Sequence, residues 1–85
     1  MKNKKYLITG GTGFIGSALV KRLVKEGYDV RVIDNDIRGA QERLKDIKNR
    51  IEFVKGDIRN FDDVRKSCIG VDCVIHLAYI KSRIT

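Results

Sequence analysis

Four short runs of apolar residues are spaced along the chain, and each has the length of a buried strand. They are Tyr6 to Thr9, Val30 to Asp34, Ile51 to Val54 and Cys73 to Leu77. Their apolar residues are nearly continuous and do not alternate with polar ones, which is typical of strands covered on both faces. The pattern predicts four strands of a parallel sheet.

Helical spacing fills the intervals between these runs. The first interval has apolar residues three and four positions apart, with Lys and Arg between them, and Gly27 supplies a stop. Its expected apolar stripe is Phe14, Ile15, Ala18, Leu19, Leu23 and Val24. The second helix is expected around Ala40 to Lys48, short and exposed, because only Leu44 and Ile47 anchor it.

The third interval carries start and stop signals for a helix. Asn60 is the expected cap, acidic residues occupy the first turn, and Gly70 ends the helix. Its expected apolar stripe is Phe61, Val64 and Cys68. Alternation of strands and helices implies right-handed parallel crossovers, so the chain is expected to form a doubly wound α/β fold.

Composition narrows the class of protein. The chain has 85 residues, 42% of them hydrophobic and 34% charged, which suits one small domain. No apolar run approaches the roughly 20 residues of a membrane span, so no membrane partner is expected. Cys68, Cys73 and the single His76 do not make a zinc pattern, and two reduced thiols fit a cytoplasmic protein.

The formal net charge is +7, which raises the question of a polyanionic partner. Lys and Arg are spread over every segment and do not form one block, so nucleic acid is not the expected partner. A surface that attracts a phosphate-bearing cofactor, or an acidic remainder elsewhere in the protein, explains the charge equally well.

The most informative motif is TGGTGFIG at residues 9–16, between the first strand and the first helix. At this junction Gly10 permits the bend, Gly13 lets the backbone approach a pyrophosphate, and Gly16 lets the helix lie close to the sheet. The start of the helix offers N–H groups to anionic oxygens. The motif predicts a dinucleotide-binding site.

Asp34 ends the second strand, eighteen residues after Gly16. Its carboxylate is placed to accept hydrogen bonds from both hydroxyls of the adenosine ribose. A carboxylate there repels a 2′-phosphate, so NAD is expected as the cofactor. Arg31 and Arg38 leave NADP open as the alternative.

Asp57 follows the third strand in the turn Gly56, Asp57, Ile58. Its carboxylate can accept from the adenine amino group, or it can satisfy the backbone of its own turn, as Asp often does. The residues alone leave both interpretations open.

Together, TGGTGFIG, the strand ending in Asp34 and Asn35, the turn GDIRN and the run VIHLA resemble the extended short-chain dehydrogenase/reductase family. The resemblance covers roughly residues 4–78 and is strongest to NAD-dependent nucleotide-sugar epimerases and dehydratases. It implies a Rossmann-type doubly wound parallel sheet, incomplete here, with four strands in the order 3-2-1-4 and three helices. Residues 1–85 would form a partial dinucleotide-binding domain without the C-terminal catalytic part.

The resemblance also implies a set of NAD-binding residues. The pyrophosphate would lie against the backbone of the glycine loop, the ribose against the end of the second strand, adenine against the turn after the third, and the middle of the cofactor against the end of the fourth. In that order the residues are Gly10, Gly13, Phe14, Ile15 and Gly16; Asp34 and Asn35; Asp57 and Ile58; Leu77 and Ala78. His76 would be a structural or cofactor-wall residue, not a catalytic one.

The family's catalytic Tyr and Lys, four residues apart, are not matched. Tyr79 has Arg83 at the fourth place and directly follows the fourth strand, so no catalytic residue is assigned. We therefore expect an NAD(H)-binding N-terminal portion, inactive alone, that meets a nucleotide sugar only within a longer protein. The alternatives are a stand-alone NAD-responsive module and a basic nucleic-acid-binding domain. The unprotected fourth strand predicts a homo-oligomer.

Overall fold

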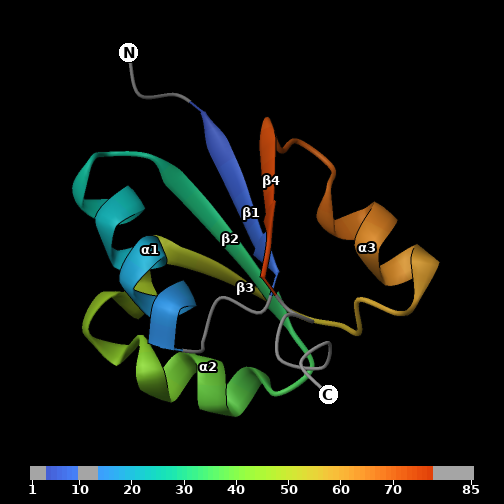
Figure 1. The fold of residues 1–85 in the computed structure, drawn as a ribbon, viewed down its shortest axis with the longest axis horizontal. Coiled ribbons are helices and arrows are strands. Elements are labelled where there is room, and N and C mark those ends of the chain that lie inside the picture. Colours follow the sequence, from blue (N-terminus) through green and yellow to red (C-terminus); the bar gives the residue numbers. More distant parts are fainter. Residues whose placement is uncertain (1–3, 10–13, 78–85) are drawn as a thin grey trace.

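One parallel sheet with helices on both faces makes up the computed structural model, which describes residues 4–9 and 14–77 (Figure 1). The strands are β1 (Lys5–Thr9), β2 (Asp29–Asp34), β3 (Ile51–Lys55) and β4 (Cys73–His76). All pair in parallel, in the order β3-β2-β1-β4. The predicted α/β class, doubly wound topology and strand order are confirmed.

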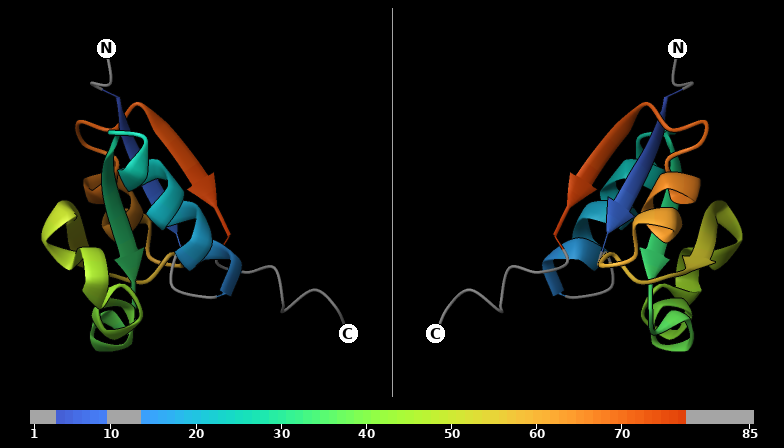
Figure 2. Two further views of the ribbon diagram at one scale, coloured as in Figure 1. Left: turned by 90° about the vertical axis from the view of Figure 1, so that its left-hand side faces the viewer. Right: turned by 90° about the vertical axis from the view of Figure 1, so that its right-hand side faces the viewer.

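Strand register divides the side chains between the two faces of the sheet, because paired residues of parallel strands point the same way. The row Ile8, Val32 and Phe53 faces α1 and α2, and the row Leu7, Arg31 and Glu52 faces α3. The two views of Figure 2 bring α1 to the front on one side and α3 to the front on the other. The third helix therefore crosses to the opposite face, as in a doubly wound fold.

Helix α1 (Phe14–Lys25) packs through a row of residues spaced by four: Gly16, Val20 and Val24 are buried. Leu19 and Leu23 lie partly buried beside this row. The predicted stripe was wrong in part, because Ile15 is 72% exposed, Ala18 is exposed, and the fully buried Val20 was missed. Burial of Gly16 agrees with its expected part in bringing the helix close to the sheet. Gly27, with φ of 93°, ends the helix region as predicted.

Helix α2 (Ile37–Arg43) begins and ends earlier than the predicted Ala40 to Lys48. Asp36 caps it, accepting from the Gly39 backbone N–H at 3.2 Å. A Cβ atom at Gly39 would collide with the Asp36 carboxylate, so the cap and the glycine belong together. Leu44, fully buried as the expected anchor, stops the helix and leads into the 3-10 segment η1 (Lys45–Arg50).

Helix α3 (Phe61–Ser67) begins at the predicted cap, since Asn60 Oδ1 accepts from the Asp63 backbone N–H at 3.1 Å. Gly70, with φ of 78°, follows the helix as predicted. The predicted stripe was wrong at Phe61, which is 77% exposed, while Ser67 is buried in its place. The helix is short, so its first residue projects beyond the sheet instead of onto it.

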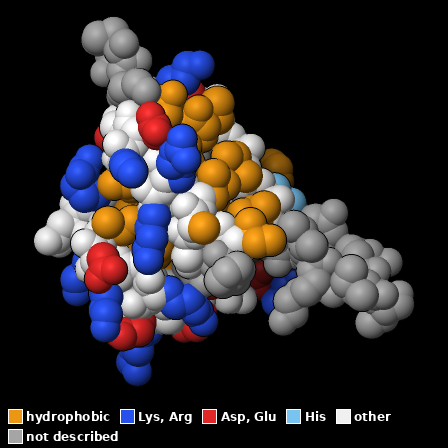
Figure 3. Space-filling view, turned by 60° about the vertical axis from the view of Figure 1, so that its left-hand side comes forward, with side chains coloured by type: hydrophobic (Ala, Val, Ile, Leu, Met, Phe, Trp, Pro, Cys, Tyr) orange, Lys and Arg blue, Asp and Glu red, His pale blue; other side chains and the backbone are white. Residues whose placement is uncertain are grey.

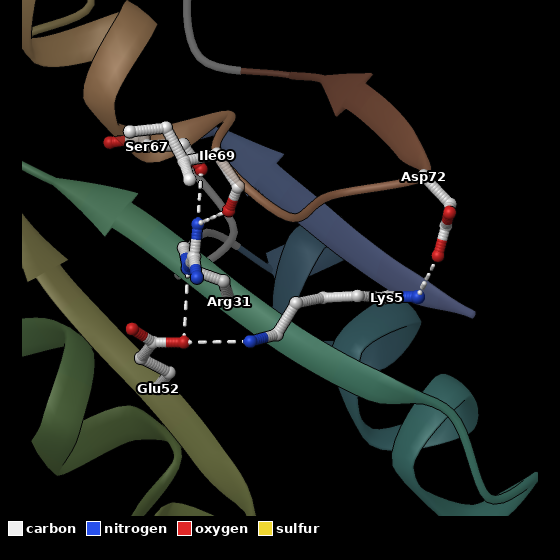
Figure 4. A network of polar contacts seen from close by, with 6 residues as sticks. All are labelled: Lys5, Arg31, Glu52, Ser67, Ile69 and Asp72. Carbon is white, nitrogen blue, oxygen red and sulfur yellow. Dashed lines mark hydrogen bonds and ion pairs between the residues drawn. The ribbon is translucent and has the colours of Figure 1, made fainter. Parts of the chain in front are cut away.

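A polar network attaches the end of α3 to the sheet (Figure 4). Arg31 Nη1 donates to the carbonyl oxygens of Ser67 and Ile69 at 2.6 and 2.7 Å. Its Nε donates to Glu52 Oε1 at 3.0 Å, and Lys5 Nζ reaches the same oxygen at 3.1 Å. The Arg31 guanidinium bonds the end of α3, so it is not placed to hold a 2′-phosphate. The alternative of NADP as the cofactor therefore depends on Arg38.

Candidate cofactor site

The carboxyl ends of the four parallel strands meet at one edge of the sheet. The strand order changes direction at β1, because β2 and β3 lie on one side of it and β4 lies on the other. Doubly wound sheets hold ligands at such a switch point. Thr9, Asp34 and His76, the last residues of three strands, lie along this edge.

The N-terminus of α1 opens at the same edge. Its preceding residue, Gly13, has no side chain to cap the helix, and the first turn of α1 holds no acidic residue. By contrast, Asp36 and Asn60 cap α2 and α3. The first N–H groups of α1 and its positive dipole end lie at this edge, where they can attract an anion.

The glycine-loop residues predicted to hold the pyrophosphate divide between the described and undescribed parts of the chain. Gly10 and Gly13 lie outside the described residues, and Phe14 is the first residue of α1. Ile15, in the first turn of α1, is 72% exposed, and Gly16 is buried.

Asp34 is half-buried at the end of β2, and its orientation is fixed locally. Its Oδ1 accepts from the Asp36 backbone N–H at 2.8 Å, while its carbonyl accepts from the Gly56 N–H at 3.2 Å. The second bond places the turn after β3 beside Asp34, and Asn35 follows as an exposed residue. Asp34 and the Asp57 turn are thus neighbours at the edge, as the sequence predicted.

Asp57 satisfies its own turn, which confirms one of the two open interpretations. Its Oδ1 accepts from the Arg59 backbone N–H at 2.8 Å, and Arg59 Nη2 donates to Oδ2 at 2.8 Å. These bonds, the side-chain ones first, lower the pKa of Asp57 from its usual 3.8 to about 2. Contact with adenine, through Asp57 and the half-buried Ile58, stays a prediction.

Gly56 has a packing role that sequence reasoning missed. A Cβ atom there would lie 2.9 Å from Ile33 Cδ1 and 3.3 Å from Asp63 Cβ, so a larger residue would require the Ile33 side chain and the start of α3 to shift. The Asp57 backbone N–H, one residue later, donates to Asp63 Oδ2 at 2.9 Å. The turn is therefore attached to α3 as well as to β2.

The Thr9 hydroxyl is a second feature that the sequence did not reveal. Thr9 is 2% exposed, and its Oγ1 lies 2.7 Å from His76 Nδ1. The Leu77 backbone N–H donates to both the carbonyl and the hydroxyl of Thr9, at 3.1 and 3.2 Å. Leu77 is half-buried where it was expected to border the cofactor, and Ala78 lies outside the described residues.

Within residues 4–9 and 14–77, no group of His, Cys, Asp and Glu is arranged to hold a metal ion, and no helix is long and apolar enough to cross a membrane. Cys68 and Cys73 are free, partly buried thiols, as expected. The edge combines an oriented carboxylate at the end of β2 with the start of a helix after β1. Those groups suit a ribose and a pyrophosphate.

Comparison with known proteins decides the family. The model of the NAD dependent epimerase/dehydratase family matches residues 6–85. The chain belongs to this family. Among the curated relatives of this family member is the bifunctional UDP-glucose 4-epimerase and UDP-xylose 4-epimerase 1 of Pisum sativum, 39% identical over 90 residues that cover 94% of the chain and 26% of the relative.

Solved structures agree with this assignment. The UDP-glucose 4-epimerase of Thermotoga maritima with UDP-glucose superposes with a TM-score of 0.74 at 34% identity, covering 87% of the family member and 24% of that chain. The 3-ketoacyl-(acyl-carrier-protein) reductase of Brucella melitensis complexed with NADH gives 0.66 at 32% identity, covering 84% and 32%. The chain thus spans about a quarter of the length of its curated epimerase relative.

Proposed function

We propose that this chain binds NAD(H) at the carboxyl edge of its sheet, as the N-terminal cofactor-binding portion of a nucleotide-sugar epimerase or dehydratase. The observation that carries the proposal is the pairing of two features on adjacent strands. The Asp34 carboxylate is held in place by the Asp36 N–H at the end of β2, and the start of α1 follows β1. One suits a ribose diol and the other a pyrophosphate.

The residues take the parts expected from the sequence. Backbone groups of Gly10, Gly13, Phe14 and Ile15 receive the pyrophosphate, and Gly16 allows α1 to approach. Asp34 and Asn35 receive the ribose, Asp57 and Ile58 the adenine, and Leu77 and Ala78 the middle of the cofactor.

Adenine binding at Asp57 competes with an internal ion pair. The Arg59 guanidinium occupies both carboxylate oxygens, at 3.1 Å from Oδ1 and 2.8 Å from Oδ2. The Arg59 side chain is 83% exposed, so moving it aside is inexpensive. We expect an adenine amino group to share Oδ1 or Oδ2 after a rotation of the Arg59 side chain.

When bound, NAD supplies the capacity to take and return a hydride. In this proposal the described residues of the chain bind and orient the cofactor. The family's catalytic Tyr and Lys are not matched at Tyr79 and Arg83, so the chain by itself is proposed to be inactive. A nucleotide sugar becomes a substrate only with the rest of a longer protein.

Titration calorimetry of the purified chain with NAD tests the proposal. Asp34→Ala should weaken binding about tenfold or more, because hydrogen bonds to a charged group contribute about 1.5–3 kcal/mol. Asp29→Ala is the matched control, since it removes the same charge from the other end of β2. Absence of binding by folded wild type, or equal loss in both variants, would contradict the proposal.

Self-association through the free edge of β4 is the second proposal. Among the described strands, β4 pairs only with β1, and Cys73–His76 holds no Lys, Arg, Asp or Glu. The other edge strand, β3, carries exposed Glu52 and Lys55, which oppose strand addition. Val74 is 51% exposed, and Figure 3 shows hydrophobic side chains gathered on the flank of α1 towards β4, with Lys and Arg on the opposite flank.

A second copy can pair with this edge by antiparallel addition of its own β4 about a two-fold axis. Analytical ultracentrifugation should then give a dimer for wild type and a monomer for Val74→Lys. Phe61→Lys, which changes an exposed apolar residue away from the edge, should remain dimeric. A monomeric wild type at high concentration would refute the proposal.

A further inference from the structure

The Thr9 side chain joins the ends of the two strands on either side of the switch point. Thr9 ends β1 and His76 ends β4, and the two residues are register partners. Thr9 Oγ1 lies 2.7 Å from His76 Nδ1 and 3.2 Å from the Leu77 backbone nitrogen. Since Thr9 is 2% exposed, its hydroxyl depends on these protein groups and not on bulk water.

Counting hydrogens assigns a direction to the bond between Thr9 and His76. A hydroxyl has one hydrogen to donate and two lone pairs that accept. The Leu77 N–H is necessarily a donor, so it takes one lone pair of Thr9 Oγ1. The second lone pair of Oγ1 could accept from a protonated Nδ1, but the partners of Oγ1 among the described residues would then leave the hydroxyl hydrogen without an acceptor. An unprotonated His76 Nδ1 accepts it. The neutral His76 ring therefore carries its proton on Nε2.

We propose that Thr9 is a positioning residue that fixes His76 in the Nε2–H tautomer and holds the ends of β1 and β4 together at the edge of the proposed cofactor site. Thr9 is the last residue of β1. Leu77 directly follows β4, and Thr9 holds its N–H with both its carbonyl and its hydroxyl. The part of this inference that concerns the cofactor rests on the proposed NAD site.

The hydroxyl adds what the backbone of Thr9 cannot. The carbonyl bond to Leu77 continues the ladder between β1 and β4, but it does not orient an imidazole. The hydroxyl bonds both the Leu77 N–H and the His76 ring, so one atom orients the imidazole and holds the residue that follows β4. A valine at position 9 retains the branched shape and loses both bonds, and a serine retains both bonds.

Nitrogen-15 NMR of the imidazole tests the tautomer, and His76 is the sole histidine, so its signals need no assignment. At about pH 8.5, where imidazole is neutral, wild type and Thr9→Ser should show an unprotonated Nδ1 and a protonated Nε2. Thr9→Val should show a mixture of tautomers. A protonated Nδ1 in the wild type would overturn the assignment without any variant having to fold.

Calorimetry with NAD tests the positioning role. Thr9→Val should bind NAD about twofold to tenfold more weakly than wild type, the equivalent of a net hydrogen bond, and Thr9→Ser should restore the affinity. Ser67→Ala is the matched control, because it removes another buried hydroxyl, whose Oγ donates to the Asp63 carbonyl at 2.8 Å on α3. It should lower thermal stability without changing NAD affinity or the His76 signals.

The outcomes separate the two proposals. Equal NAD affinity in wild type and Thr9→Val overturns the positioning role while leaving the proposed NAD site intact. Failure of wild type to bind NAD overturns the proposed function, and the His76 nitrogen shifts then decide the hydrogen-bond assignment by themselves.

Discussion

Replacing Arg31 with methionine should release α3 from the sheet. The Arg31 side chain is 12% exposed, and its guanidinium donates to two carbonyl oxygens at the end of α3, at 2.6 and 2.7 Å. Methionine retains the apolar stem and lacks the donors. The carbonyls of Ser67 and Ile69 then lose their partner, and only apolar contacts and the bonds of the Asp57 turn hold the helix.

The size of the loss follows from the bonds themselves. Hydrogen bonds from a charged donor contribute about 1.5–3 kcal/mol each. Ile69 is exposed, so its orphaned carbonyl can bind water and the lower value applies to its bond. Ser67 is buried, so at least the same value applies to its carbonyl, and the two bonds together contribute at least about 3 kcal/mol. Glu52, with half its side chain exposed, adds under about 1 kcal/mol. At about 4–8 °C per kcal/mol for a domain of this size, the melting temperature should fall by about 12–24 °C.

Urea and thermal unfolding followed by far-ultraviolet circular dichroism measure this change. Arg22→Met is the matched control, because Arg22 is 72% exposed and pairs with Glu26 within α1. It should change the free energy of unfolding by less than about 0.5 kcal/mol. If Arg31→Met were as stable as the control, α3 would be held by apolar packing and the reasoning would be wrong.

For three further substitutions the structure predicts whether the protein gains or loses stability. The pKa of Glu52 is lowered from its usual 4.5 because Lys5, and then Arg31, donate hydrogen bonds to it. The wild type should therefore lose stability as the pH falls below about 4.5, and Glu52→Gln should lose less stability in acid titrations of unfolding. Ser17 Oγ is buried without a partner among the described residues, so Ser17→Ala should raise the free energy of unfolding by about 1 kcal/mol in urea. Asn60→Ala removes the cap of α3 and should lower it by about 1 kcal/mol.

Each of these has a clear contrary result. Parallel acid curves for wild type and Glu52→Gln would mean that the carboxylate does not depend on its two cations. Destabilisation by Ser17→Ala would show that the hydroxyl has a partner in solution. An unchanged Asn60→Ala protein would mean that Asp62 and Asp63 sustain the start of the helix alone.

Local pattern was sufficient to place the strands, whereas their order came from the family resemblance. Each apolar run corresponds to a strand within one residue at either end, because burial on both faces demands continuous apolar residues. The start of α2 was missed because the helix was placed from its apolar anchors, Leu44 and Ile47, and not from its cap, Asp36. The collision that a Cβ at position 39 would make with Asp36 shows why the glycine is there.

Long-range polar contacts were beyond prediction from the sequence. Arg31 lies in a buried strand, and only the register of β2 and the end point of α3 reveal that carbonyls of residues 67 and 69 will receive its guanidinium. The Thr9 bond to His76 spans 67 residues for the same reason. By contrast, Asp34 was placed correctly, because the end of a parallel strand is a local property.

The most direct test of the central claim is NMR of the nitrogen-15-labelled chain titrated with NAD. The backbone amides of Ile15, Asn35, Ile58 and Leu77, at the carboxyl edge of the sheet, should shift progressively. Those at the amino edge, such as Asp72, whose N–H donates to the Lys5 carbonyl at 2.8 Å, should stay in place. Shifts confined to the amino edge, or none at millimolar NAD in a folded sample, would contradict a cofactor site at the carboxyl edge.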